Sequence, residues 1–405
     1  MKNSEPELSV KPRYEVLDGL RGVAATMVVA YHLFETYSGF DHIRQIVNHG
    51  YLAVDFFFTL SGFVIGYAYD DRWAKGMSAW TFFKRRLIRL HPLLILGTIF
   101  GALLFYFGYH IGPTEEECVT PMIATTSPWK MLAVMFLCFL MIPIGKSMDI
   151  RGWAETNPLN VPTWSLQWEY LANILYALII RHFSTLMLGA FVAACGVLTV
   201  MLCLNIDAFG ILAARDYAAY TVIGGWTLAP DQLLIGATRV LYPFFAGLLL
   251  SRLHVSITIK RGGFLLCSTI IVAALAMPYF APDSAPWVNG IYEAAVILVV
   301  FPLVIAMGSG SCGGGGRLCR FHGELSYPLY IMHFPLVYMQ RAWVADHATA
   351  PPSQHIAVNL SLYILAIAVA WAAYKLYDIP VRQWLSGKRK EQKTQLEGNT
   401  NHEQT

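Results

Sequence analysis

Charged residues are scarce in this chain of 405 residues: Asp, Glu, Lys and Arg make up 14% of it, and 56% is hydrophobic. A soluble domain usually has about 25% charged residues. This shortage excludes an ordinary soluble fold and indicates that most of the chain lies in membrane lipid. The formal net charge of +3 is too small to indicate a nucleic-acid partner.

Metal-binding and disulfide patterns are also missing. The seven cysteines form no CxxC pair and have no His partners at zinc spacing, so we expect no metal site and no disulfide framework. We expect most of them to act as small hydrophobic residues inside helices. The seven are Cys118, Cys138, Cys195, Cys203, Cys267, Cys312 and Cys319.

Three further signals are absent. The start MKNSEPELSVKPRYE lacks the apolar core of a cleavable signal peptide, so we expect the first apolar helix to insert and remain. Residues 313–316, four glycines, lack the GKS/T ending of a P-loop and predict a flexible loop. No period of about 20–50 residues repeats, which disfavours a solenoid or an inverted-repeat transporter.

What the chain does have is a series of apolar stretches long enough to cross a bilayer about 30 Å thick. They predict an all-α fold, a polytopic integral membrane bundle. We count ten or eleven candidate transmembrane helices and expect about ten to span. The candidate spans are 17–35, 51–69, 93–109, 129–145, 165–183, 185–205, 233–251, 263–281, 290–308, 325–343 and 356–378.

Basic residues indicate the orientation. Lys and Arg gather in the tail 1–13, in the second loop and in the tail 386–405, and positive loops favour the cytoplasmic side. We expect both tails in the cytoplasm, the second of them disordered, and the membrane domain 14–385 in the bacterial inner membrane. The acidic run 115–117 then lies outside. Termini on one side require an even number of spans, so one candidate between 129 and 251 is expected not to cross.

Arg21 and His32 form the most informative pair. They lie eleven positions apart on the first predicted span, almost three helical turns, so they share one face about 16 Å apart. Ionisable groups inside a membrane segment usually face a polar cavity. The alternative is an interfacial anchor at Arg21 and a helix-packing hydrogen bond at His32. Asp18 is expected either to pair with Arg21 or to cap the helix.

His32, expected deep in the hydrocarbon, is a candidate general base, since a neutral imidazole exchanges protons near neutral pH. A carboxylate is needed to stabilise the imidazolium, and Asp55 and Glu169 are the candidates because both interrupt apolar segments. Trp164 and Trp168 lie beside Glu169 and are candidate substrate contacts. The alternative is a tryptophan belt at the membrane interface, with Glu169 in the headgroup zone.

The loop FFKRRLIRLHP carries a candidate phosphate site. Arg86 and Arg89 are three positions apart on one helix face, with Lys84 and Arg85 beside them. Forked guanidinium groups match phosphate oxygens. We expect Pro92 to end this short helix where the next span begins. The alternative is ordinary positive charge beside lipid headgroups.

Two other segments contain candidate residues. Ser61 and Gly62 in the second span are expected to allow close helix packing, and Ser61 is also a candidate substrate contact. Tyr330 and His333 are three positions apart on a late helix, so both are expected to face the cavity and to contact substrate.

Five motifs occur in one order along the chain: LDGLRGVAATMVVAYH, DFFFTLSGFVIG, RRLIRLHP, WSLQWEY and LSYPLYIMH. Together they resemble the membrane-bound acyltransferase-3 family over about residues 13–385. The resemblance implies a cytoplasmic acyl-CoA donor and an acceptor hydroxyl at or beyond the membrane. The family's functional motifs map onto Arg21 and His32, Arg86 and Arg89, and Trp164, Ser165, Leu166 and Glu169. Some members carry an extracellular esterase-like domain, which we expect this chain to lack.

We expect the protein to be an O-acyltransferase, and more specifically an O-acetyltransferase. The expected donor is acetyl-CoA, the expected acceptor is a glycan, and we expect no metal. We expect the CoA phosphates to dock on Arg86 and Arg89, and His32 to take the proton of the acceptor hydroxyl. The alternative from another class is a proton-coupled secondary transporter or exporter of sugar-containing substrates, since buried His, Asp and Glu in many spans fit that class too.

Overall fold

The structure, a computed structural model, describes residues 13–105, 125–212, 215, 218–280, 284–311 and 316–387. The expectations for the acidic run, for most of both tails, for Cys118 and Cys312 and for most of the glycine-rich loop lie outside these residues. Within them the chain is helical, and the only bridges between extended residues are two isolated ones.

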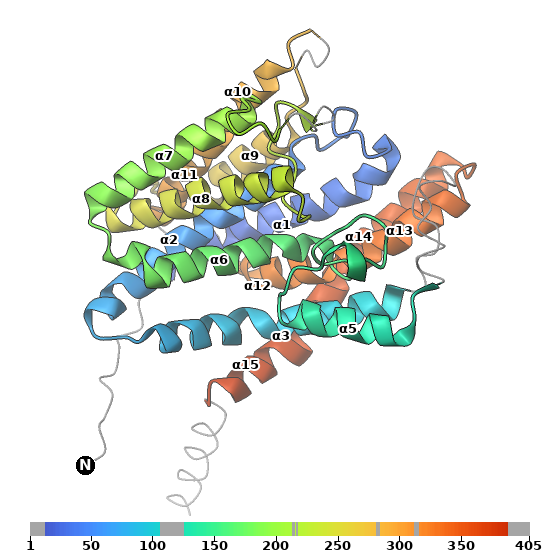
Figure 1. The fold of residues 1–405 in the computed structure, drawn as a ribbon, viewed down its shortest axis with the longest axis horizontal. Coiled ribbons are helices and arrows are strands. Elements are labelled where there is room, and N and C mark those ends of the chain that lie inside the picture. The colour runs from blue at the N-terminus through green and yellow to red at the C-terminus, as the bar shows by residue number, and fades with distance from the viewer. Residues whose placement is uncertain are drawn as a thin grey trace, which may run out of the picture.

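The helices of the described residues confirm the all-α membrane bundle (Figure 1). Six helical stretches are long and apolar enough to cross a membrane. The α-helices are α1 (Glu15–Glu35), α2 (Ala53–Ala74), α3 (Ala79–Phe105), α5 (Pro128–Phe139), α6 (Trp164–Leu178), α7 (Thr185–Cys203), α8 (Pro230–Arg252), α9 (Gly263–Ala276), α10 (Trp287–Ala295), α11 (Phe301–Ser309), α12 (Gly316–Met332), α13 (Phe334–Asp346), α14 (Pro352–Ala372) and α15 (Ile379–Leu385).

Two π-helical turns each join two α-helices into one longer, continuous helix. The turn η7 (Val296–Val300) joins α10 to α11, and η8 (Ala373–Asp378) joins α14 to α15. Short 3₁₀ turns occupy several connections. They are η1 (Thr36–Ser38), η2 (Gly50–Leu52), η3 (Lys146–Met148), η4 (Val161–Thr163) and η5 (Ile180–His182).

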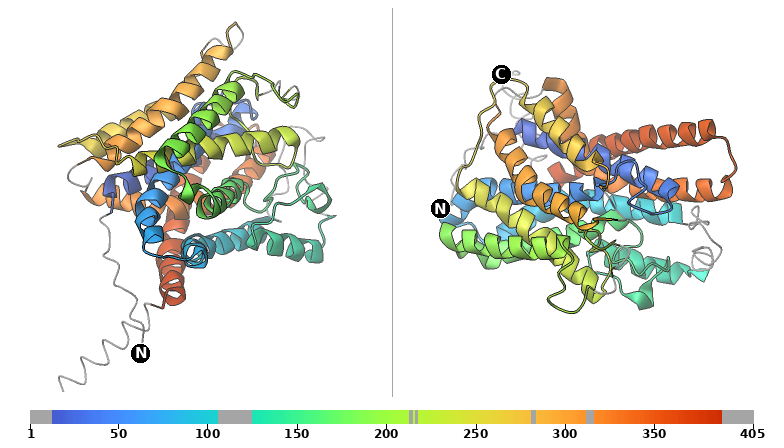
Figure 2. Two further views of the ribbon diagram at one scale, coloured as in Figure 1. Left: turned by 60° about the vertical axis from the view of Figure 1, so that its left-hand side comes forward. Right: turned by 90° about the horizontal axis from the view of Figure 1, so that it is seen from above.

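Glycines allow the central helices to touch. The helices run side by side, with α1, α2 and α8 in the interior and α3 beside α5 at one edge (Figures 1 and 2). A Cβ on Gly62 of α2 would lie 1.7 Å from the carbonyl oxygen of Phe244 in α8, and one on Gly247 would lie 1.9 Å from that of Thr59. Small residues at such crossings let backbones approach closely, so the packing expected at Gly62 is confirmed.

Three predicted spans contain helices too short to cross by themselves. At 1.5 Å per residue, α5 with 12 residues, α9 with 14 and α6 with 15 reach about 18, 21 and 22 Å, less than a bilayer core. The last carbonyl of α5, that of Phe139, lies 2.9 Å from Nε2 of His91, near the middle of α3. The candidates 129–145 and 165–183 thus contain helices shorter than a bilayer core, and the expectation that one candidate between 129 and 251 does not cross stays a prediction.

Two predicted helix boundaries are wrong. Pro92 does not end a helix but lies inside the continuous α3. The Tyr327 hydroxyl donates to the carbonyl of Leu90, two residues before it, at 2.6 Å. The span predicted at 325–343 is two helices, broken at His333, because Pro335 has no N–H and is best tolerated in the first turn of a new helix.

The described cysteines are buried inside helices, as expected for small hydrophobic residues. They are Cys138, Cys195, Cys203, Cys267 and Cys319. Among the residues that the structure describes, no group of three or more His, Cys, Asp or Glu side chains is placed to hold a metal ion.

Candidate functional site

A cavity of about 450 Å³ lies between the start of α1, most of α2, the first half of α3, the start of α6, α12 and the segment from η8 into α15. Its lining on α2 runs from Val54 to Arg72, about 27 Å at 1.5 Å per residue. The cavity is therefore elongated along the helices. We call its two ends the arginine end, where α2 finishes, and the inner end, where α2 begins.

Seven arginines line this cavity, and three of the four predicted from sequence are among them. Arg21 donates from Nε to Ser326 at 2.8 Å, and Arg86 pairs with Glu169 at 2.5 Å. Arg89 makes no hydrogen bond or ion pair within the described part of the chain. The set is Arg13, Arg21, Arg72, Arg86, Arg89, Arg320 and Arg382.

The four basic residues 84, 85, 86 and 89 point in two directions from helix α3. Arg86 and Arg89 face the cavity, as their spacing of three predicts, whereas Lys84 and Arg85 are exposed and do not line it. Lys84 and Arg85 thus fit the alternative, charge beside lipid headgroups, and the structure does not bring them to the cavity.

Asp18 pairs with Arg21, one of its two expected roles. The carboxylate lies 3.4 Å from the Arg21 guanidinium. It does not cap the helix, since α1 begins at Glu15 and the amide of Asp18 is already bonded to the carbonyl of Tyr14. A second carboxylate, Glu169, holds Arg86 across the same cavity. Arg21 and Arg86 are therefore each held in one direction by a carboxylate.

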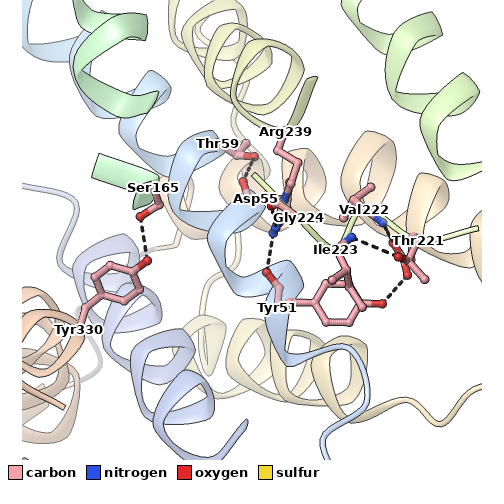
Figure 3. A network of polar contacts seen from close by, with 11 residues as sticks. Tyr51, Asp55, Thr59, Ser165, Thr221, Val222, Ile223, Gly224, Arg239 and Tyr330 are labelled. Atoms are coloured by element: carbon pink, nitrogen blue, oxygen red, sulfur yellow. Dashed lines mark hydrogen bonds and ion pairs between the residues drawn. The ribbon is translucent and has the colours of Figure 1, made fainter. Parts of the chain in front are cut away.

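Tyr330, Ser165 and Phe57 close the inner end. The Tyr330 hydroxyl lies 2.7 Å from that of Ser165 (Figure 3), and both lie within 2.9 Å of the carbonyl of Pro162. Each hydroxyl has one proton, so one donates to the carbonyl and the other to its partner or to the same carbonyl, and no donor is left for a ligand. The ring of Phe57 meets that of Tyr330 edge-on, with centroids 5.4 Å apart. These residues form a wall.

His32 lies behind this wall and does not line the cavity. It is in the last turn of α1 rather than deep in a span, because α1 ends at Glu35. Its ring stacks on His333 at 5.5 Å between centroids, and the ring of His333 is 6.1 Å from that of Tyr330. The side chain faces α13 and is 20% exposed. Two rings therefore separate His32 from the cavity.

The carboxylate beside His32 is Glu35, not Asp55 or Glu169 as expected. Glu35 lies 3.2 Å from Nδ1 of His32 and also pairs with Arg341 at 2.5 Å. The sequence contained this signal, since Glu35 is three positions after His32 on the same helix. Arg341, on α13, is distant in sequence and was missed.

Asp55 has a different partner, which explains its position in an apolar helix. Its carboxylate pairs with Arg239 of α8 at 2.7 Å, and both side chains are at most 1% exposed (Figure 3). Arg239 also donates to the carbonyls of Tyr51 and Gly224. The pair joins α2 to α8 and the loop before α8.

The two tryptophans pack against other parts of the protein, Trp164 buried and Trp168 half-buried. Trp164 is buried beneath the guanidinium of Arg239, 5.2 Å from its ring, and Nε1 of Trp168 donates to the carbonyl of Gly225. Neither lines the cavity, whereas Ser61 does.

Tyr330 faces the cavity as expected, but His333 does not. Nδ1 of His333 lies 3.0 and 2.9 Å from the carbonyls of Leu329 and Tyr330, so Nδ1 carries the proton. Its Nε2 is buried and has no hydrogen-bond partner among the described residues. The break between α12 and α13 turns this ring toward His32.

These features define a polytopic membrane protein with an elongated, arginine-lined cavity among its helices. The chain belongs to the acyltransferase-3 family, whose model, described as an acyltransferase domain, matches residues 14–375. It is therefore a multi-pass membrane acyltransferase.

Individual relatives agree with the family. The chain is 22% identical over 93% of its length to O-acetyltransferase OatA of Staphylococcus aureus (strain NCTC 8325 / PS 47), of which it spans 58%. It is 35% identical over 44% of its length to protein 2 in the picA locus of Rhizobium radiobacter, covering 85% of that protein. Acyltransferase MdmB of Streptomyces mycarofaciens is 28% identical over 41% of the chain and is covered to 39%. No solved structure matches the chain significantly.

Proposed function

We propose that this protein is an O-acetyltransferase that moves the acetyl group of cytoplasmic acetyl-CoA to a hydroxyl of a carbohydrate acceptor. The observation that carries the proposal is the cavity: it is elongated, basic at one end and lined by Val54, Phe57 and Leu60 toward the other. A donor with an anionic head and a slender arm fits this distribution. The printed names of OatA and MdmB, an O-acetyltransferase and an acyltransferase, support the chemistry.

The arginine end is proposed to face the cytoplasm, where acetyl-CoA is available. Exposed basic residues gather there, namely Lys75 after α2 and Lys84 and Arg85 near the start of α3. Basic segments favour the cytoplasmic side of a membrane. Arginine groups around the opening would neutralise the CoA phosphates in two-point contacts.

His32 is proposed as the general base. The Nδ1–H of His32 donates a hydrogen bond to the carboxylate of Glu35. The lone pair of the neutral ring is then on Nε2, where it can take the proton of the acceptor hydroxyl. As Nε2 takes the proton, the oxygen attacks the thioester carbonyl, the carbon–sulfur bond breaks, and the thiolate recovers a proton from the imidazolium. Glu35 stabilises the imidazolium as a fixed anion. A thioester reaches this ring only if Tyr330 swings away from Ser165, so the wall is proposed to move during transfer.

The acceptor is proposed to approach from the His32 side of the wall. Arg341, which holds Glu35, has Phe40 and Trp153 around its guanidinium at 4.8 and 5.9 Å. The ring of Phe40 is 38% exposed. Flat rings beside a charged group suit the apolar faces and hydroxyls of a sugar.

The test uses purified protein in proteoliposomes with acetyl-CoA and a glycan acceptor. Free CoA thiol should appear only when both substrates are present. His32→Ala should lower kcat by about 10²–10⁴ while leaving acetyl-CoA affinity unchanged, because His32 lies outside the cavity. Transfer by His32→Ala at the parental rate would refute the base assignment. A proton-coupled transporter would release no thiol under any of these conditions.

A further inference from the structure

Glu35 lies at a position in α1 that disfavours a negative charge. It is the last residue of the helix, where carbonyls without intrahelical partners make the helix end partly negative. His32, three positions earlier, suits this end, because an imidazole can carry a positive charge there. The Glu35 carboxylate therefore needs a cation from outside α1 to stay ionised beside His32.

Arg341 of α13 supplies that cation. Its Nη2 donates to Oε2 of Glu35 at 2.5 Å, and the same oxygen lies 3.2 Å from Nδ1 of His32. The side chain of Arg341 is 6% exposed and that of Glu35 is 19% exposed. Hydrogen bonds between charged groups are stronger than those between neutral ones. Arg341 thus fixes the oxygen that accepts the Nδ1 proton of His32.

One helix, α13, contacts both members of the pair. Phe334 and Arg341 are seven positions apart, about two turns, so they share a face of this helix. The ring of Phe334 meets that of His32 edge-on, with centroids 4.9 Å apart, and Arg341 reaches Glu35. The neighbouring Gln340 donates to a backbone carbonyl of α1 at 3.0 Å, which holds the two helices in this register.

Aromatic rings enclose the Arg341 guanidinium. Four ring centroids lie within about 6 Å of it, the distance at which a cation is attracted to a ring face. They belong to Phe40 at 4.8 Å, Phe334 at 5.4 Å, and Trp153 and Tyr338 at 5.9 Å each. Its Nε is buried and makes no hydrogen bond with the residues that the structure describes. The guanidinium is therefore confined beside Glu35, its charged partner.

We propose that Arg341 is a positioning residue for the transfer: it holds the Glu35 carboxylate so that His32 keeps its proton on Nδ1 and presents Nε2 to the acceptor. This inference rests on the proposed function and adds a residue to it. Without Arg341 the carboxylate can turn away, and the Nδ1 proton loses its fixed acceptor. The ring can then take the other tautomer, whose lone pair is on Nδ1 and faces away from the acceptor hydroxyl.

The first experiment separates kcat from KM, in proteoliposomes with acetyl-CoA and a glycan acceptor. Arg341→Ala should lower kcat about ten- to hundredfold, the cost of a misplaced catalytic group. The KM for acetyl-CoA should change less than about twofold, because Arg341 does not line the cavity.

Arg252→Ala is the matched control. Arg252 pairs with Asp70 at 2.7 Å and is 12% exposed, so the variant also breaks a largely buried ion pair. This pair joins α2 to α8 near the ends of both helices and contacts neither Glu35 nor His32. Activity per folded molecule should be unchanged in this variant.

Guanidinium ion can replace the missing group. Added guanidinium should raise the kcat of Arg341→Ala severalfold, because the ion fits the space left by the side chain and pairs with Glu35. Urea, which has a similar shape but no charge, should not. Neither should raise the kcat of His32→Ala. A purely structural role of Arg341 would not produce this pattern.

A double variant shows through which residue Arg341 acts. Glu35→Gln/Arg341→Ala should have the same kcat as Glu35→Gln within about twofold, because Arg341 has no carboxylate left to hold. Arg341→Lys keeps a cation for Glu35 but not the forked geometry, so it should retain more activity than Arg341→Ala. This variant also serves if Arg341→Ala does not fold.

Each contrary outcome overturns a definite statement. If Arg341→Ala raises only the KM of the acceptor, Arg341 binds the acceptor and does not position His32. If Arg341→Ala lowers kcat by the same factor with Glu35 and with Gln at that position, it acts independently of Glu35. A parental kcat in Arg341→Ala overturns the positioning role alone. If the parent protein releases no thiol with both substrates, the proposed function falls and takes this role with it.

Discussion

Asp55 and Arg239 allow a direct test of whether a buried carboxylate is structural or catalytic. Their ion pair spans 2.7 Å, and the two side chains are 0% and 1% exposed. Removing one partner of such a pair leaves an uncompensated buried charge, which costs about 3–5 kcal/mol. Asp55→Asn, which removes the charge at constant volume, should lower the free energy of unfolding by that amount.

Asp55→Asn should have the opposite effect on the free energy of unfolding when Arg239 is also replaced. Arg239→Met removes the cation, leaves Asp55 as a lone buried anion, and leaves the carbonyls of Tyr51 and Gly224 without this donor. Its expected cost is about 3–5 kcal/mol for the charge plus about 1–3 kcal/mol for each carbonyl. Adding Asp55→Asn to Arg239→Met should then stabilise the protein, because it removes the unpaired charge.

The assay is reversible unfolding in mixed detergent micelles, with activity per folded molecule measured in parallel. Asp41→Asn is the control, since Asp41 pairs with Arg44 at the surface, where Arg44 is 81% exposed and such pairs contribute about 0–1 kcal/mol. Equal destabilisation by Asp55→Asn in both backgrounds would refute the ion-pair argument. Loss of activity by folded Asp55→Asn would restore the catalytic role expected from sequence.

Three further predictions follow from particular contacts. Gly62→Ala should cost about 1–3 kcal/mol of stability, because its Cβ meets a carbonyl of α8 at 1.7 Å, while Gly189→Ala, whose Cβ meets nothing within 4 Å, should not destabilise; equal melting temperatures would contradict the packing argument. Burial raises the pKa of Glu155, in the loop before α6, to about 8, so folding favours its protonated form and stability should decline as pH rises from 4.5 to about 8. Glu155→Gln should flatten that decline in a pH series of melting temperatures, and an unchanged slope would exclude Glu155 as its source. Glu35→Gln should lower kcat by about 10²-fold with an unchanged KM for acetyl-CoA, because Glu35 holds His32 and lies outside the cavity; a raised KM alone would place it on the donor path.

Contacts between near neighbours on one helix were predictable. Asp18 and Arg21, three positions apart, pair as expected, and Arg86 and Arg89 face the same cavity. Helix periodicity fixes such neighbours without any knowledge of the rest of the fold. By the same rule Glu35, three positions after His32 on the same helix, was within reach of its ring.

Partners from distant segments were not predictable. Arg239 lies 184 positions from Asp55, and Arg341 lies 306 positions from Glu35. Which helix packs against which depends on close approaches such as that of Gly62 to α8 and on the breaks at α5, α6 and His333. A single sequence contains the residues of these contacts but no distance between them.

The sequence by itself determined that this is an all-helical membrane protein of the acyltransferase-3 class, because apolar length, scarce charge and five ordered motifs are local or additive properties. Tertiary structure alone decided which carboxylates Arg86, Arg239 and Arg341 meet. It also decided that a wall of Tyr330 and Ser165 stands between the cavity and His32. These distances join helices far apart in the chain, and only side-chain packing brings them together.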